Sequence, residues 1–266
     1  MTGEARIVTT SEIPDVVRWL GDTSETVMSV HRLTSDLGLA SVVGLPGDYR
    51  AVVVQGALLP EEPVAFGDHA EMIWSAARIL TGWSAINAPA ASAGALGEVI
   101  QRDTAAEIEL GPEVYFVRSG EETRARHNGA ARLLTSADLP LVETATEALG
   151  MQGWRFGSAS LLLELGCVAG ACDDGELVSV AFTSAISARH GEIGVVTRSD
   201  HRGLGLARAC AVLVTAAVEA RGLVAVWSTS TDNLPSRRIA ESLGFVPFSR
   251  RNYVNVLRGR SGTNHD

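Results

Sequence analysis

The feature that most constrains this fold is an internal repeat. Residues 5–16 (ARIVTTSEIPDV) align without a gap with residues 131–142 (ARLLTSADLPLV), and five positions are identical. Each segment is typical of a short strand, a Ser/Thr/Asp cap and the start of a helix. The two segments begin 126 residues apart, at residues 5 and 131. A period of this length indicates a duplicated domain, because solenoid repeats have periods of about 20–50 residues.

A second similarity follows in the same order along the chain. Residues 83–89 (WSAINAP) resemble residues 227–235 (WSTSTDNLP). Residues 118–128 are polar and mixed in charge with no apolar period, which is typical of a linker. We therefore predict two tandem domains, residues 1–126 and 127–260, followed by a disordered C-terminal end.

The composition limits the possible partners. Hydrophobic residues make up 46% and charged residues 20% of the chain, as in ordinary globular proteins. The net charge of −9 disfavours nucleic-acid and anionic-membrane partners. No apolar stretch reaches the ~18 residues that span a bilayer, and we see no signal peptide. The three cysteines show no metal-ligand spacing, so we expect a cytoplasmic protein with buried, reduced thiols and no metal.

Residues 193–207 carry the clearest functional signal. An apolar strand (193–197) leads through a polar turn to Arg202-Gly203-Leu204-Gly205, and a helical run covers 206–220. The first N–H groups of a helix have no intrahelical partner, and the helix dipole favours an anion there. Glycine lets a phosphate approach the backbone. The segment predicts a site for a pyrophosphate-bearing cofactor.

Two common phosphate-binding loops do not fit. A P-loop needs a lysine, whereas all 22 basic residues of this chain are arginines. A Rossmann fingerprint needs a third glycine where this chain has Arg208.

The loop Arg202–Ala207 (RGLGLA) instead resembles the Arg/Gln-x-x-Gly-x-Gly/Ala loop of the GNAT superfamily of acyl-CoA-dependent N-acyltransferases, although it is one residue shorter when counted from Arg202. Downstream, Asn233, Ser236 and the sequence Leu-Gly-Phe at 243–245 resemble the second signature of that family. The resemblance covers roughly residues 130 to 257. It implies an α/β (α+β, GNAT-type) fold, with a mixed, mostly antiparallel central sheet flanked by helices.

The resemblance also implies acetyl-CoA as co-substrate and assigns its contacts. The strand before the loop would pair with pantetheine and stabilise the oxyanion, the loop would hold the pyrophosphate, and the second signature would lie beside both. The implied cofactor-binding residues are Val195, Val196, Thr197, Arg202, Gly203, Leu204, Gly205, Leu206, Ala207, Asn233 and Ser236.

The proton-transfer groups are less completely defined. Glu192 begins the same strand, and many relatives use a carboxylate there, so we expect Glu192 to be the base. The tyrosine that serves many relatives as the acid is replaced by Ala240. Tyr253 is our candidate for the acid, with Ser236 or unassisted thiolate departure as alternatives. We expect His190 and His201 to face solvent.

The first repeat differs where the cofactor would bind. Ahead of its helix (70–80) it has residues 64–69 (VAFGDH), with no Arg-Gly-x-Gly, and Asp68 would repel a phosphate. We therefore expect one acetyl-CoA per chain and acetyl transfer to a primary amine of a small molecule. A protein N-acetyltransferase and a non-catalytic acyl-CoA-binding module are the alternatives. The chain leaves open whether the protein is a monomer or a homodimer.

Overall fold

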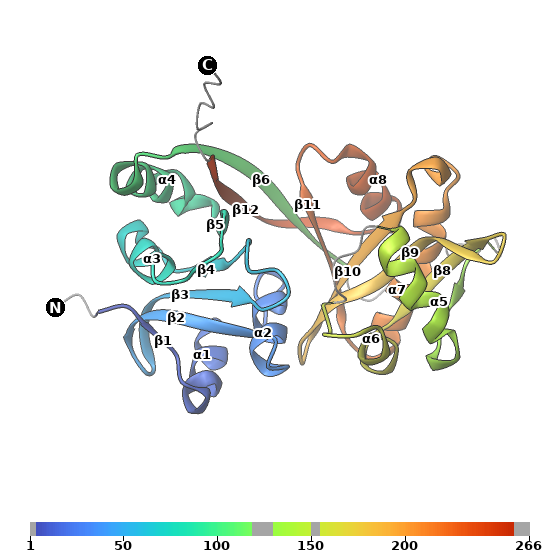
Figure 1. Ribbon diagram of the computed structural model, residues 1–266, viewed down its shortest axis with the longest axis horizontal. Coiled ribbons are helices and arrows are strands. Elements are labelled where there is room, and N and C mark those ends of the chain that lie inside the picture. The colour runs from blue at the N-terminus through green and yellow to red at the C-terminus, as the bar shows by residue number, and fades with distance from the viewer. Residues whose placement is uncertain (1–3, 119–129, 150–154, 258–266) are drawn as a thin grey trace, which may run out of the picture. The chain divides into compact units, whose positions relative to one another are not determined.

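The fold is given by a computed structural model that describes residues 4–118, 130–149 and 155–257 (Figure 1). The chain forms two compact units. Unit 1 comprises Met1–Leu20, Gly38–Glu113 and Arg250–Asp266, and unit 2 comprises Gly21–Leu37 and Val114–Ser249. The linker predicted at 118–128 and the predicted C-terminal tail lie almost entirely outside the described residues.

The order of elements repeats along the chain, which confirms the tandem halves. The first repeat contains β1 (Arg6–Ile7), η1 (Thr10–Glu12), α1 (Ile13–Leu20), α2 (Val27–Thr34), β2 (Gly38–Leu45), β3 (Asp48–Gly56), β4 (Val64–Phe66), α3 (Ala70–Ala77), β5 (Ala85–Pro89), α4 (Ala90–Thr104) and β6 (Glu107–Arg118). The second contains β7 (Arg132–Leu133), η2 (Ser136–Asp138), α5 (Leu139–Ala148), α6 (Ala159–Leu165), β8 (Val168–Asp173), β9 (Glu176–Ile186), β10 (His190–Thr197), η3 (Ser199–His201), α7 (Leu206–Ala220), β11 (Val224–Ser230), α8 (Leu234–Ser242) and β12 (Val246–Leu257). In this description only η3 lacks a counterpart.

The two repeats begin with the same local structure. Arg6 forms two hydrogen bonds to the Glu12 carboxylate, of 2.8 and 2.6 Å, and that carboxylate accepts the Thr9 N–H. Arg132 and Asp138 form the same pair at 2.9 and 2.6 Å, again at a capping box. The aligned sequence positions therefore make equivalent contacts, which chance similarity would not produce.

The sheet is mixed and mostly antiparallel, as predicted. In unit 1 the strand order is β1-β2-β3-β4-β5-β12-β6, and in unit 2 it is β6-β11-β10-β9-β8-β7. Strand β4 pairs with β5, and β10 with β11, in parallel. The pairs β1–β2, β2–β3, β3–β4, β5–β12, β7–β8, β8–β9 and β9–β10 are antiparallel.

The last strand of each repeat contributes to the other unit. Residues 251–255 of β12 pair with β5 in unit 1, and the end of β6, from Val114, belongs to unit 2. Residues 21–37, which include α2, also belong to unit 2. The compact units therefore differ from the division at 126/127, because strand pairing joins segments from both repeats.

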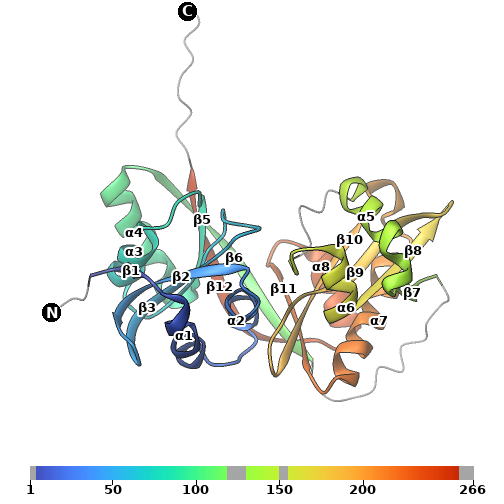
Figure 2. The ribbon, with the colours of Figure 1, turned by 60° about the horizontal axis from the view of Figure 1, so that its bottom comes forward.

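The helices of unit 1 lie on both faces of its strands. Figure 2 shows α1 on one side and α3 and α4 on the other. Residues at alternate positions of β3, including Ala51 and Val53, join the core with Ile73 of α3 and Leu96 of α4. The period of two along the strand thus determines which side chains meet the helices.

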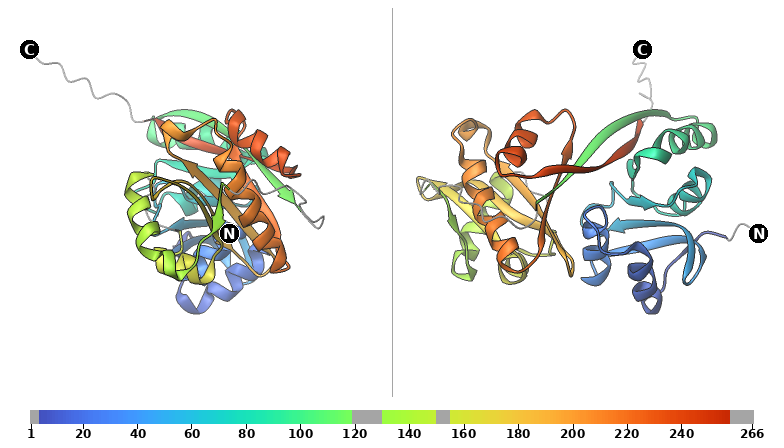
Figure 3. Two further views of the ribbon diagram at one scale, coloured as in Figure 1. Left: turned by 90° about the vertical axis from the view of Figure 1, so that its right-hand side faces the viewer. Right: turned by 180° about the vertical axis from the view of Figure 1, so that it is seen from behind.

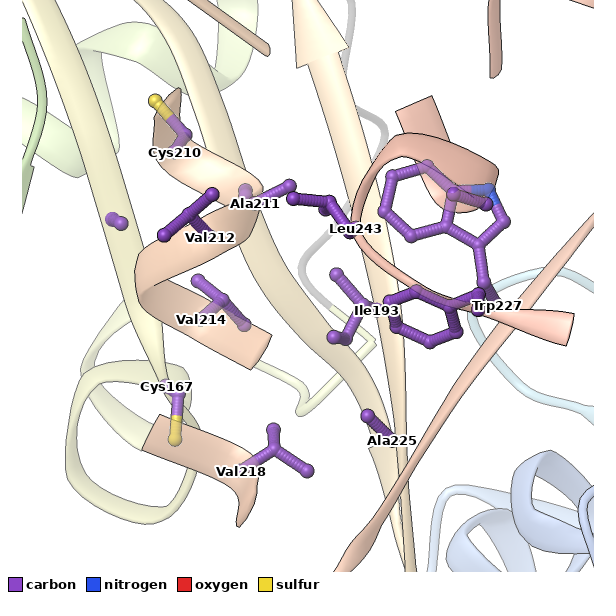
Figure 4. Close-up of a cluster of buried hydrophobic side chains, with 14 of the residues drawn as sticks. Cys167, Ile193, Cys210, Ala211, Val212, Val214, Val218, Ala225, Trp227 and Leu243 are labelled. Carbon is purple, nitrogen blue, oxygen red and sulfur yellow. The ribbon is translucent and has the colours of Figure 1, made fainter. Parts of the chain in front are cut away.

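Unit 2 has the same layered plan (Figure 3). On one face Ala169, Ala181 and Ile193 pack with Cys210 and other residues of α7. Figure 4 shows Ile193 and the side chains of this helix. On the other face the neighbouring positions, including Val168, Val180 and Phe182, pack with α5 and α6. The sheet is therefore covered on both sides. Val195 and Val196, near the end of β10, each pack against one of these two clusters.

Strands β8 and β9 form a hairpin. Its turn contains Asp174 and Gly175, at φ 46° and 82°, and an Asp-Gly pair between two β-rich runs is a typical hairpin signal. The structure corrects the prediction that all three cysteines are buried. Cys167 and Cys210 are buried, but Cys172 is exposed because it lies at the hairpin end. Within the described residues no helix has the length and apolarity needed to cross a membrane, and no group of side chains could hold a metal ion.

Candidate active site

The glycines between β10 and α7 adopt a conformation that requires glycine. Gly203 and Gly205 have φ of 80° and 78°, which residues with a side chain rarely adopt, and a Cβ at either position would meet no atom of the described residues within 4 Å. The glycines therefore serve the turn and leave open space in front of the backbone.

The backbone N–H groups of this loop are free to bind a ligand. Among the described residues, the N–H groups of Gly203, Leu204 and Gly205 donate to no backbone carbonyl. The first helical bond after the loop runs from the Ala209 N–H to the Gly205 carbonyl, at 3.1 Å. The N–H groups of Leu206 and its neighbours in the first turn thus have no helical partner, and together with the helix dipole they form an anion-binding end.

The arginine ahead of the glycines is available to an anion. Arg202 is exposed, and within the described part of the chain its side chain makes one hydrogen bond, of 3.4 Å to the Thr197 carbonyl, and no ion pair. Arg198, in contrast, is paired with Asp200 and Glu176. Arg202 is therefore the cation of this loop that can turn to a phosphate.

We expected His201 to face solvent, but its side chain is only 14% exposed. Its ring lies 2.9 Å from Asp173 and 2.8 Å from Asp200, and these hydrogen bonds raise the pKa of the imidazole. Hydrogen bonds from His201 and Arg198 lower the pKa of Asp200 to about 2. This ionic cluster stabilises the turn beside the loop.

Strands β10 and β11 separate just where the predicted cofactor strand begins. They pair in parallel only at residues 190–192 of β10 and 224–226 of β11. Beyond this point residues 193–197 pair with β9 alone among the described strands. The edge that carries Val195, Val196 and Thr197 is therefore open to an added extended chain, and its side chains are half-buried.

Glu192 lies at the point of separation, next to a register shift in the β9–β10 ladder. Its side chain is buried, and Oε1 accepts a 2.7 Å hydrogen bond from the Ser228 hydroxyl. Oε2 is buried and has no hydrogen-bond partner among the residues that the structure describes. A buried carboxylate oxygen without a partner is costly, so this atom is suited to accept a proton or a cationic group from a bound molecule.

The second signature lies at the start of α8. The Asn233 side chain accepts the Ser236 N–H at 3.2 Å and caps the helix. The Ser236 hydroxyl accepts from the Trp227 indole N–H at 2.9 Å and keeps its own proton to donate. Both residues thus have structural roles, and their assignment to the cofactor stays a prediction.

Tyr253 belongs to a different part of the fold from Glu192. It lies in unit 1, opposite Asn87 in the β5–β12 pair, whereas Glu192 belongs to unit 2. The structure thus does not place Tyr253 among the residues of the β10–α7 site, and its role as the acid stays a prediction.

His190 is also buried rather than solvent-facing. Its Nδ1 lies 2.7 Å from Asp22 Oδ1, which also accepts the Ser187 hydroxyl at 2.7 Å, while Oδ2 accepts the Arg189 N–H. Burial opposes ionisation of Asp22, but the hydrogen bonds from Ser187 and His190 outweigh it and lower the pKa. This contact ties the segment before α2 to the start of β10.

Sequence reasoning missed Ser228 and Asp22. Ser228 stood in the second repeated stretch without an assigned role, and only the parallel register of β10 and β11 brings it to Glu192. Asp22 is far from His190 in sequence, so no local pattern could have paired them.

Comparison with known proteins identifies this region. A model of the GNAT acetyltransferase family matches residues 146–253. The second repeat is a GNAT acetyltransferase domain. The match includes the anion loop, Glu192 and both signatures, so the expected family is confirmed. No curated protein matches the chain.

Solved structures extend the likeness to nearly the whole chain. A GCN5-related N-acetyltransferase-like protein from Streptococcus suis is 20% identical, with a TM-score of 0.64 over 93% of this chain and 100% of that one. A GNAT-family acetyltransferase from Colwellia psychrerythraea is 11% identical, with a TM-score of 0.60 over 95% and 99%. A tandem GNAT protein from the clavulanic acid biosynthesis pathway is 14% identical, with a TM-score of 0.58 over 97% and 100%. These likenesses show the tandem GNAT fold.

Proposed function

We propose that unit 2 binds acetyl-CoA and transfers its acetyl group to a primary amine of a small molecule. The observation that carries this proposal is the separation of β10 from β11 directly before the open loop. The open strand edge suits the two amides of pantetheine, and the helix end with Arg202 suits the pyrophosphate. We assign Val195, Val196, Thr197 and the loop Arg202–Ala207 to the co-substrate, with Asn233 and Ser236 beside it.

The proposed chemistry is direct attack within a ternary complex. Acetyl-CoA supplies the acyl group as a thioester. Glu192 Oε2 takes the proton from the acceptor ammonium, directly or through water, so that the neutral amine attacks the thioester carbonyl. Backbone N–H groups at the open edge of β10 stabilise the oxyanion. The new C–N bond then replaces the C–S bond. The nitrogen releases its second proton to solvent, and the CoA thiolate takes a proton from Tyr253, from Ser236 or from solvent.

Two features support a small, cationic acceptor. The carboxylate of Glu192 is enclosed, and α2 packs over its two register neighbours, Ala185 and Val226. A buried carboxylate beside α2 favours a slender ammonium group over a folded protein surface. The negative net charge of the chain acts in the same direction.

Replacing Glu192 separates an enzyme from a binding module. Glu192→Gln keeps the hydrogen bond with Ser228 within reach but removes the base, so turnover should fall about 100-fold or more while acetyl-CoA affinity stays within about twofold. Exposed Glu164 on α6 provides the matched control, Glu164→Gln, which should change neither. Equal turnover of wild type and Glu192→Gln would exclude Glu192 as the base, and no turnover with any amine would favour the binding module.

A further inference from the structure

Helix α2 covers the row of side chains that contains Glu192. Ala185, Glu192 and Val226 are register partners on β9, β10 and β11, so their side chains point to the same face of the sheet. Val27 of α2 belongs to the same buried cluster as Ala185 and Val226, and Met28 packs against that cluster. Met28, which is partly exposed, thus packs against the register neighbours of Glu192, whose Oε2 has no partner among the described residues.

A second charged group lies beside Met28. Arg155 Nη1 is 3.7 Å from the Met28 sulfur, and a thioether is only a weak acceptor. No carboxylate of the described residues lies within ion-pair distance of Arg155, although its side chain is half-buried. A partly buried guanidinium with no anionic partner is costly and is suited to an anion from outside the chain.

The backbone at Arg155 is held in place. His31 Nε2 donates to the Arg155 carbonyl at 3.3 Å, and the His31 ring packs on Phe156 with centroids 4.6 Å apart. Burial, together with the charge of Arg32, lowers the pKa of His31, so this ring is neutral near neutral pH. Arg155 therefore contributes the uncompensated positive charge next to Met28.

From these observations, and resting on the proposed function, we infer that the acceptor is an amine that also carries an acidic group. Its ammonium lies at Glu192 Oε2, and its carboxylate or phosphate lies at Arg155. Met28, from the first repeat, separates the two charges and lines the wall between them. Amines that carry both charges are selected, and neutral or purely cationic amines lose the Arg155 contact.

The test compares amines that differ only in the acidic group. Wild type, Arg155→Gln and the exposed control Arg189→Gln are assayed for CoA release with amino acids and their carboxamides, and with phosphoethanolamine and ethanolamine. We expect Arg155→Gln to raise KM for the acid-bearing amine about 10- to 100-fold with little change in kcat, since hydrogen bonds between charged groups have this magnitude. KM for the neutral counterpart and the Kd for acetyl-CoA should stay within about twofold. The phosphate and carboxylate series show which anion is preferred.

Three results would overturn the inference. The first is equal use of acid-bearing and neutral amines by wild type, and the second is an equal effect of Arg155→Gln on both. The third is a protein that binds acetyl-CoA and acetylates only amines without an acidic group, or none of the panel. Failure to bind acetyl-CoA at all would instead remove the proposed function, so the two failures are distinguishable.

Discussion

The two repeats use the same strand–turn–helix junction in different ways. In unit 2 the glycines between β10 and α7 face open space, whereas in unit 1 a Cβ on Gly67, between β4 and α3, would lie 2.7 Å from the Arg50 carbonyl. Gly67 is therefore required by packing within the protein, while Gly203 and Gly205 keep space for something outside it. A glycine at this junction indicates a ligand only where its missing side chain leaves open space.

The electrostatics of the two junctions also differ. A cavity of about 750 Å³ borders the start of α3, and carboxylates line it at Asp68, Glu71 and Glu98. Arg102, the arginine in its lining, is paired with Glu71. In unit 2 the corresponding helix begins with open N–H groups beside Arg202, which has no ion pair with any described carboxylate. The fold of the repeat thus persists without the charges that hold a pyrophosphate, and we propose that unit 1 has lost the acetyl-CoA site.

The largest expected effect comes from closing the open loop of unit 2. Gly203→Val places a branched side chain where the phosphate would approach and strains a positive φ. We expect acetyl-CoA affinity to fall at least about 1,000-fold, because several charge-assisted contacts are lost together. Isothermal titration calorimetry measures it.

Gly222, just after α7, is the matched control for this prediction. It has φ of 76°, and a Cβ there would meet no atom of the described residues within 4 Å, so Gly222→Val imposes a similar strain away from the loop. Gly222→Val should lower stability and keep acetyl-CoA affinity. Equal loss of affinity in both variants would mean that strain, rather than the site, explains the first result.

The next largest effect is on stability and concerns β12, the strand of the second repeat that pairs within unit 1. Arg251 of β12 is buried and donates to the carbonyls of Ala65 and Asn87 and to the Asn87 side chain. Arg251→Met leaves these buried groups without their donor, so we expect a loss of about 3 kcal/mol in the free energy of unfolding. Urea denaturation checks it.

The neighbouring exposed residue supplies the comparison for Arg251. Arg250→Met should change the free energy of unfolding by less than about 0.5 kcal/mol, because surface substitutions have small effects. If the two variants were equally stable, β12 would not be an integral part of unit 1.

The smallest effect tests the shared start of the repeats. The Arg6 hydrogen bonds and the Thr9 N–H lower the pKa of Glu12 to about 2, and Arg132 with Thr135 lowers the pKa of Asp138 in the same way. A lowered carboxylate pKa stabilises the fold fully above the unfolded-state value of about 4 and loses this contribution as the pH falls through the folded-state value.

Glu12→Gln and Asp138→Asn should therefore each lower the melting temperature slightly at pH 7. The difference from wild type should shrink as the pH falls from about 4 towards about 2. Thermal unfolding followed by circular dichroism at several pH values checks this. A difference that did not depend on pH, in either repeat, would contradict the equivalence of the two ion pairs.

Much of the fold followed from local sequence signals. The repeat at 5–16 and 131–142 predicted the duplication because its caps and ion pairs are formed within a few residues. The loop Arg202–Ala207 and the Asp174-Gly175 turn are local in the same sense. The exchange of β6 and β12 was not predictable, because it depends on which distant edge each strand pairs with.

One part of the candidate site was likewise predictable from local sequence, and another part was not. Glu192 and the loop could be predicted as one site because they lie on one strand–turn–helix segment. The contacts of Glu192 with Ser228, and of His190 with Asp22, depend on strand register and on α2, so periodicity could not indicate them. Tyr253 was a candidate because Ala240 replaces the tyrosine that many relatives use, and the strand exchange places Tyr253 in unit 1.

The central claim is that one repeat has the acetyl-CoA site and the other has lost it. The most direct test is the stoichiometry of acetyl-CoA binding, measured by calorimetry on the full chain with wild type and Gly203→Val. We predict one molecule per chain for wild type and none for Gly203→Val. Two molecules per chain, or one that persists in Gly203→Val, would contradict the claim.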